Sequence, residues 1–235
     1  MRWVLLVLAI GCGPKTVRIR PPAARDLSNV VFIPYSSSAV ESFFDKDGRV
    51  CARFDGQVRD YFAGWQSHEQ GEPACDHDTF DDGLHDATLE LRWHGVIPAD
   101  GAWDLIGGGF AVGAWGRVQA RGSYYGDFVA RARVVLEVTS PHCRAEWSAD
   151  LAKAAVTGVY ARARDFTGWT EIPDLRLDGC KAGDPLDVRV RLVADSNRGR
   201  IEVDAFGFST LNNDELNRIF GVRRGTASAA AASPR

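Results

Sequence analysis

The sequence has 235 residues, of which 45% are hydrophobic and 25% are charged, with 28 basic and 31 acidic side chains. This length and composition suffice for one globular domain with a substantial core, and the charge lacks the basic excess of a nucleic-acid-binding protein. We therefore expect one domain and no nucleic-acid partner.

The first eleven residues have the composition of a secretory signal peptide. Arg2 supplies a positive charge, residues 3–10 form an unbroken apolar run, and Gly11 precedes Cys12. The run is less than half of the about 20 apolar residues that a membrane-spanning helix needs, so we expect cleavage after Gly11. Loss of Arg2 leaves 27 basic against 31 acidic residues, a formal charge of −4.

Residues Ala9-Ile10-Gly11-Cys12 resemble a bacterial lipobox, in which small residues precede a cysteine that is diacylated before cleavage. The resemblance implies that Cys12 becomes the lipid-bearing first residue of the mature chain. Two or three acyl chains such as palmitate hold a protein at a membrane, since each buried methylene contributes about 0.8 kcal/mol. Gly13, in place of aspartate, implies the outer membrane of the cell envelope in the better-known sorting rule.

Composition divides the chain into four segments. The signal peptide covers residues 1–11, and a lipidated, proline-containing tether covers 12–28. A β-sandwich domain is predicted for residues 29–221. The alanine-rich residues 222–235 are predicted to be a disordered tail.

The domain is predicted to be an all-β, antiparallel β-sandwich of jelly-roll type with one short C-terminal helix. Short segments rich in Val, Trp, Phe and Arg are separated by Gly, Asp and Pro. Alternation predicts that Leu89, Leu91 and Trp93 face inward while Glu90 and Arg92 face water. The predicted strands are 30–34, 49–54, 88–93, 110–120, 128–138, 143–148, 156–162, 187–192 and 199–208, and the predicted helix is 212–220.

Charged residues alternate with apolar residues along the same strands. Arg131 and Arg133 flank an alanine, and Asp187, Arg189 and Arg191 alternate with valines. This placement is typical of a solvated sheet face, so we assign no functional role to it.

The segment Trp169-Thr170-Glu171-Ile172-Pro173 precedes a long alternating strand at 186–192 and a further strand at 199–206. This order resembles the C-terminal half of the galactose-binding-like jelly rolls, a fold shared by many carbohydrate-binding modules, and the resemblance covers residues 110–209. In that family the closing strand carries an acidic pair; Asp204 matches its first member and Ala205 replaces the second. The resemblance implies a structural calcium ligand at Asp204.

Four cysteines remain after Cys12, namely Cys51, Cys75, Cys143 and Cys180. An even number in an exported chain predicts two disulfides, and three pairings are open. We favour Cys51 with Cys75 and Cys143 with Cys180, because each pair closes a local loop and contributes about 3 kcal/mol. A zinc site is not expected, since no two of these cysteines lie within four residues of each other.

Residues 75–86 contain the densest group of oxygen ligands in the chain. Asp76, Asp78 and Asp81 could bind calcium, although Phe80 occupies the fifth position, where an EF-hand has a ligand. The alternative is a solvated acidic loop without an ion. No cofactor beyond this structural calcium is expected.

Aromatic residues supply the candidate ligand-binding site. Trp103 follows Gly101-Ala102 and is placed in a loop, Trp115 falls on the outer register of its strand, and Tyr125 lies nearby in sequence. Exposed rings of this kind stack against sugar rings, so the three residues predict a saccharide-binding face. The alternative is that the rings belong to the core.

No catalytic motif is found, so a non-enzymatic function is expected. The preferred interpretation is a lipid-anchored cell-envelope protein whose β-sandwich binds a saccharide or a protein partner. The alternative is a non-catalytic structural subunit of an envelope assembly. A polysaccharide-cleaving enzyme would require converging acids or a histidine–tyrosine pair in a cleft. The positions of Trp103 and Trp115 distinguish the first two interpretations.

Overall fold

The computed structural model describes residues 25–41, 63–66, 85–122, 127–158, 161–196, 199–209 and 213–225. These residues are nearly all in strands, and the predicted all-β class is confirmed. The elements are β1 (Val31–Phe32), β2 (Tyr35–Glu41), β3 (Ala63–Gln66), β4 (His85–Val96), β5 (Gly101–Gly107), β6 (Ala111–Arg121), β7 (Asp127–Thr139), β8 (Arg144–Thr157), β9 (Arg162–Phe166), β10 (Trp169–Glu171), β11 (Leu175–Cys180), β12 (Pro185–Ser196), β13 (Gly199–Phe208), the 3-10 helix η1 (Asn213–Arg218) and β14 (Phe220–Arg224).

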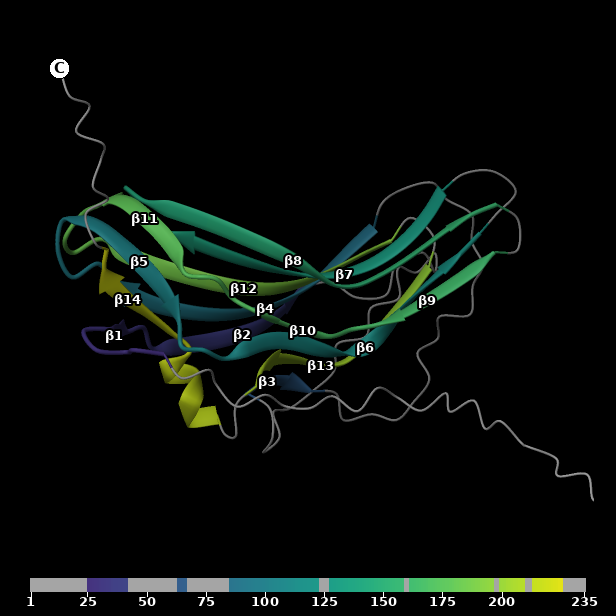
Figure 1. Cartoon of the computed structure of the whole chain (residues 1–235), viewed down its shortest axis with the longest axis horizontal. Coiled ribbons are helices and arrows are strands. Elements are labelled where there is room, and N and C mark those ends of the chain that lie inside the picture. Colours follow the sequence, from purple (N-terminus) through teal and green to yellow (C-terminus); the bar gives the residue numbers. More distant parts are fainter. Residues whose placement is uncertain are drawn as a thin grey trace, which may run out of the picture.

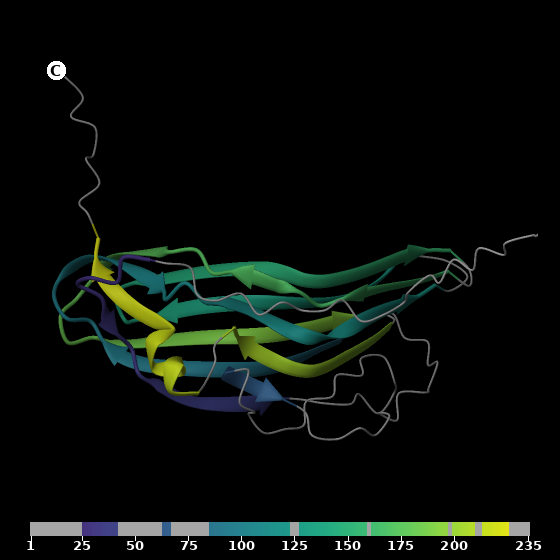
Figure 2. The ribbon, with the colours of Figure 1, turned by 60° about the horizontal axis from the view of Figure 1, so that its bottom comes forward.

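The strands form three antiparallel sheets. A five-stranded sheet has the order β2-β4-β12-β7-β8, and its long strands run side by side along the long axis of the molecule (Figures 1 and 2). A second sheet has the order β1-β14-β5-β11, and a third has the order β10-β6-β13-β3, with β9 also paired to β6. The inward side chains of all three sheets join one core, as in a β-sandwich.

The centre of this core is an aromatic cluster where the three sheets meet. Trp93 on β4 is fully buried, as predicted, and its ring lies edge-on to Phe208 of β13 and Phe220 of β14, with centroid distances of 5.7 and 4.9 Å. The indole Nε1 of Trp93 donates a hydrogen bond to the Leu216 carbonyl of η1 at 2.7 Å. Edge-to-face rings of this kind stabilise a core beyond the area that they bury.

The predicted C-terminal helix is wrong in type and extent. Residues 213–218 form a 3-10 helix, and the Ile219 amide donates to the Leu216 carbonyl three residues earlier. The chain then enters β14 at Phe220, whose side chain is fully buried. Because Phe220 must reach the core, the segment has no room for a longer α-helix.

Other predicted boundaries also change. The strand predicted at 156–162 is divided, because Gly158 has a φ of 93° that ends β8, and β9 begins only at Arg162. β14 continues to Arg224, and the Gly225 amide donates to the Ala102 carbonyl, so the sheet extends beyond the predicted domain end at residue 221. The strand predicted at 49–54 lies outside the described residues.

The disulfide Cys143–Cys180 is present, as predicted. It joins the start of β8 to the end of β11, with the two Cα atoms 5.0 Å apart. These strands are edge strands of two different sheets, so the bond links the two layers at one corner. Cys51 and Cys75 lie outside the described residues. Within the described ranges, no helix is long and apolar enough to cross a membrane.

Candidate functional site

The five-stranded sheet has one face on the core and an opposite face that carries charge. Side chains alternate between the two faces along β4, β7 and β12, because the strand period is two residues. We call the charged residues of the outer face the charged face: Glu90, Arg92 and His94 on β4, Arg131, Arg133 and Glu137 on β7, and Asp187, Arg189, Arg191 and Asp195 on β12.

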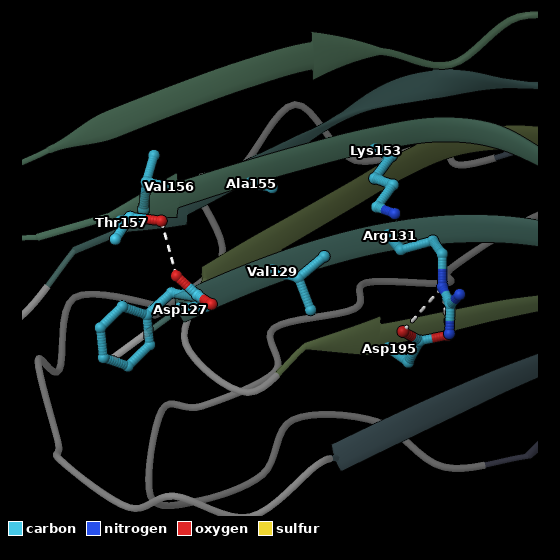
Figure 3. A pocket seen from close by; sticks show the side chains of 9 residues that line it. Asp127, Val129, Arg131, Lys153, Ala155, Val156, Thr157 and Asp195 are labelled. Atoms are coloured by element: carbon cyan, nitrogen blue, oxygen red, sulfur yellow. Dashed lines mark hydrogen bonds and ion pairs between the residues drawn. The ribbon is translucent and has the colours of Figure 1, made fainter. Parts of the chain in front are cut away.

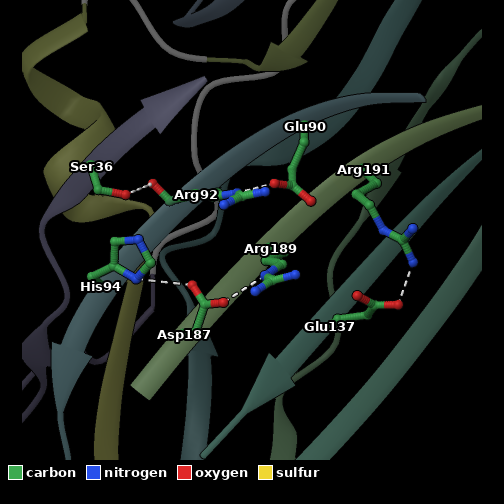
Figure 4. A network of polar contacts seen from close by, with 8 residues as sticks. All are labelled: Ser36, Glu90, Arg92, His94, Glu137, Asp187, Arg189 and Arg191. Carbon is green, nitrogen blue, oxygen red and sulfur yellow. Dashed lines mark hydrogen bonds and ion pairs between the residues drawn. The ribbon is translucent and has the colours of Figure 1, made fainter. Parts of the chain in front are cut away.

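Glu90 lies near the middle of the charged face and accepts a hydrogen bond from Nε of Arg92 (Figure 4). The prediction that Glu90 faces water is wrong, because this residue is only 5% exposed. Arg191 lies directly opposite Glu90 on the neighbouring strand and donates its own hydrogen bond to Glu137. One long arginine side chain on the same strand and one on the neighbouring strand therefore lie beside the carboxylate, where their charges compensate it.

Asp187 connects two cationic or titratable side chains at the end of the same face. Its carboxylate lies 2.9 Å from Nδ1 of His94 and accepts a hydrogen bond from Nε of Arg189 at 2.5 Å (Figure 4). The hydrogen bond from the Arg189 guanidinium to Asp187 raises the pKa of Arg189. This contact is a charge-assisted hydrogen bond between neighbouring residues of one strand face.

Asp195 is the most deeply buried acid of the charged face. Both of its carboxylate oxygens accept from Nε of Arg131, at 3.1 and 3.2 Å, and Arg133 lies 3.6 Å away. The side chain of Asp195 is 3% exposed, whereas the two arginine side chains are 30% and 34% exposed. One buried carboxylate thus holds two half-exposed guanidiniums in place.

Two valines on the outer face are also buried. Val135 and Val193 are 5% and 7% exposed, and they lie directly opposite Arg191 and Arg133 on the adjacent strand. Directly opposite side chains start about 5 Å apart, so the aliphatic parts of the arginines can cover the valines. The charged face is therefore a packed layer rather than a loose set of solvated charges.

A groove with a volume of about 480 Å³ lies at one end of this face, over β7 and β8 (Figure 3). Val129 and Ala155 line its middle and lie directly opposite each other. At one end, the Thr157 hydroxyl donates to the Asp127 carboxylate at 2.6 Å. The groove thus has an apolar middle and a polar end.

The other end of the groove is basic. Lys153 lies directly opposite Arg131 on the neighbouring strand, and both side chains line the groove with Asp195 (Figure 3). The Arg131 guanidinium is bound to Asp195, whereas the Lys153 ammonium has no ion pair within the described part of the chain. The groove can therefore offer the Lys153 ammonium to an anionic group of a ligand.

The aromatic binding face is not supported by the position of Trp103. This residue lies in β5 and not in a loop; it is 6% exposed, and its Nε1 donates to the Ala99 carbonyl at 2.9 Å. The residue opposite it on β11 is the fully buried Leu177. Trp103 shares the inward register of β5 with the buried Leu105, so its ring belongs to the core and is not available to stack on a sugar.

The other predicted site residues lie in different parts of the chain. The backbone of Trp115 lies in β6 opposite Ala205, and the backbone of Asp204 lies in β13 where the register shifts between Val203 and Ala205. Cys12, Asp76, Asp78, Asp81 and Tyr125 lie outside the described residues, so the lipid-anchor and calcium predictions stay predictions. Among the residues that the structure does describe, no group of three potential metal ligands is found.

The contacts of the charged face were not anticipated from the sequence. Asp195 and Arg131 are 64 positions apart, and no local motif connects them. The alternation of charged and apolar residues along β7 and β12 does contain a signal, because it places all these charges on one face. Which charge meets which depends on the strand order and register, and these are not readable from one strand.

The fold and this face define an antiparallel β-sandwich-like protein with one face of ion-paired charges and a groove at its end. No protein-family model matches the chain, and no curated protein sequence matches it. The resemblance to jelly-roll carbohydrate-binding modules stays a prediction.

Proposed function

We propose that this chain is a lipid-anchored, non-catalytic protein of the bacterial cell envelope whose β-sandwich serves as a structural subunit and binds a protein partner. The lipobox-like segment at Cys12 supplies the anchor in this proposal. The Cys143–Cys180 disulfide supports export, because disulfides persist in oxidising compartments such as the periplasm and the cell surface.

The observation that carries the structural role is the mutual pairing of the charged face. Arg92 pairs with Glu90, Arg191 pairs with Glu137, and Asp195 pairs with its two arginines, so these charges are bound to one another along the sheet. An active site concentrates perturbed titratable groups in a cleft where a substrate can reach them. A packed, self-compensated face favours a rigid scaffold instead.

Burial of Trp103 favours a protein partner over a saccharide. Saccharide recognition by stacking needs exposed aromatic faces, and one of the three rings predicted for this role belongs to the core. A protein partner needs no such platform, because protein interfaces also use shape, charge and main-chain hydrogen bonds.

A second candidate function is binding of a small anionic ligand, for example an acidic saccharide, and the groove beside β8 favours it. The Lys153 ammonium and the neighbouring Arg131 could meet a carboxylate or sulfate, and the apolar middle could contact a ring. If the groove binds such a ligand, Lys153→Gln should abolish binding to an array of acidic saccharides. Lys181→Gln, a substitution of an exposed lysine outside the groove, should leave this binding unchanged.

Metabolic labelling with a radioactive fatty acid tests the anchor. The full-length protein and Cys180→Ser should both carry label and fractionate with membranes, whereas Cys12→Ser should carry none and leave the membrane fraction. Label retained by Cys12→Ser would refute the anchor.

An array of neutral and acidic glycans, probed with the detergent-solubilised parent protein, tests the structural role. We expect no glycan to be bound. Any saturable binding would contradict the structural-subunit proposal. Binding that is lost in Lys153→Gln would support the groove as the ligand site, and binding that survives Lys153→Gln would restore the saccharide-binding interpretation at another site.

A further inference from the structure

The five-stranded sheet ends in β8, a strand of fourteen residues at the rim of the sheet (Figure 1). β7 pairs with one side of β8 along its length, and no strand in the described ranges pairs with the other side. On that other side the Leu151 carbonyl accepts from the Gly168 amide at 3.1 Å, and the Lys153 amide donates to Asp165 at 3.0 Å. Residues 144–150 are therefore the part of β8 that stays open, and we call them the open edge.

The charged side chains of the open edge differ from those of the charged face. Arg144, Glu146 and Asp150 are exposed and make no ion pair or side-chain hydrogen bond within the described part of the chain. On the neighbouring strands of the same sheet, the arginines and acids are bound to one another. Among the described residues, the open edge thus has no paired strand on its outer side and no ion-pair partner for its charges.

The opposite side of the open edge is apolar. Ala145, Trp147 and Ala149 alternate with the charged residues, are half-buried and pack against the core from its margin. Trp147 therefore has part of a large ring exposed at the rim of the sandwich. A strand added beside β8 would cover this ring and continue the core.

We infer that the open edge pairs with the open edge of a second copy of this chain, antiparallel and around a two-fold axis at Trp147. The inference specifies the partner in the structural role proposed above and rests on that role. Directly opposite residues of an antiparallel pair share a face of the sheet, so a two-fold axis normal to the sheet lies midway between one residue and its own copy. Only the axis at Trp147 pairs all residues of the open edge.

Charge complementarity supports this register. With the axis at Trp147, Arg144 lies opposite Asp150 of the second copy, and by symmetry this ion pair forms twice. An axis at Glu146 would place this glutamate opposite itself, and an axis at Ser148 would place Glu146 opposite Asp150. Like charges directly opposite each other on paired strands are destabilising, so both neighbouring registers are disfavoured.

The inner face supports the same register. Trp147 lies opposite its own copy, and Ala145 lies opposite Ala149, so two large rings meet between small side chains. Cross-strand aromatic pairs are among the favourable pairs in sheets. Charges on an edge strand normally disfavour pairing with another strand. Here they disfavour strands without complementary charges, whereas Arg144 and Asp150 are complementary to the same residues of a second copy. The result is one continuous sheet of ten strands.

Charge reversal tests the contact. The mature, lipidated full chain is studied by sedimentation in density-matched detergent micelles, and we expect a concentration-dependent dimer. Arg144→Asp and Asp150→Arg should each raise the dimer dissociation constant about tenfold or more, because two attractive pairs become repulsive. The double variant Arg144→Asp/Asp150→Arg should restore it. Lys181→Glu, an exposed reversal beyond β11, serves as the matched control and should change nothing.

Two further readouts accompany the sedimentation. Thermal melts should show that the single reversals leave the fold intact, because Arg144 and Asp150 have no partner within the described part of a single chain. In the dimer, the two Trp147 rings should give an exciton signal in circular dichroism, and this signal should disappear on dilution. Two chains that share a micelle by chance would not give this signal.

Three outcomes would overturn the inference. The parent chain could stay monomeric at every concentration, the dimer could be insensitive to both single reversals, or the double variant could remain as weak as the singles. Fatty-acid labelling of the same samples keeps the two proposals distinct. A monomer that carries label at Cys12 would end the self-pairing while leaving the lipid anchor in place.

Discussion

Asp195 on β12 binds Nε of Arg131 on β7 with both carboxylate oxygens, at 3.1 and 3.2 Å. The same carboxylate lies 3.6 Å from the Arg133 guanidinium, two residues further along β7. A single buried acid therefore organises two cations across a pair of long strands. Removing one partner of such a buried pair leaves a charge uncompensated, whereas isolated surface pairs contribute little to stability.

Asp195→Asn should lower the free energy of unfolding by about 2–3 kcal/mol. The substitution leaves two partly buried guanidiniums without their counter-charge, although their partial exposure lets water compensate some of the loss. Urea denaturation measures the change. Glu146→Gln on β8 should stay within about 0.5 kcal/mol of the parent, because Glu146 is exposed and has no ion pair or side-chain hydrogen bond within the described residues. Equal effects of the two variants would contradict a structural role for the Asp195 network.

Trp103→Ala should destabilise the protein by about 3–5 kcal/mol, because the ring is buried against Leu177 and its removal opens a cavity. Trp103→Phe should cost less, since it keeps most of the apolar volume and loses the hydrogen bond to Ala99. Thermal melts distinguish the two variants. If the melting temperature of Trp103→Ala matched the parent, the ring would not be a core residue.

Cys143→Ser should lower the free energy of unfolding by about 3–4 kcal/mol, as expected for a disulfide with a sequence separation of 37. Cys180→Ser should have a similar effect, and the double variant should be no worse than either single variant. Denaturation of the three proteins without reductant measures these differences. Additive losses would show that the two sulfurs contribute separately and not through one bond.

Ser28→Ala should raise the pKa of Asp26. Hydrogen bonds from the Ser28 side chain, and from its backbone amide at 2.9 Å, favour the ionised carboxylate and lower its pKa. A carboxyl group whose pKa is lower in the folded state stabilises the fold above its unfolded pKa, and this contribution is lost as the pH falls through the folded value. Carboxyl-detected NMR titration of both proteins measures the shift. An unchanged midpoint for Asp26 would show that the Ser28 hydroxyl does not lower its pKa.

Several features of this protein were determined by the sequence alone. Period-two alternation in β4, β7 and β12 separates a core face from a charged face, because an extended chain directs successive side chains to opposite sides. That pattern correctly predicted the burial of Leu89, Leu91 and Trp93. The pairing of Cys143 with Cys180 was also predicted correctly, since it closes a local loop.

Other features were decided only by the tertiary structure, because they depend on contacts between distant parts of the chain. Trp103 is buried because its face of β5 packs against the core, and Gly101 and Asp104 beside it gave no sign of that. Glu90 is buried because the arginines around it are long and lie on its own and the neighbouring strand. Strand order and register bring these residues together, and no single segment encodes either one.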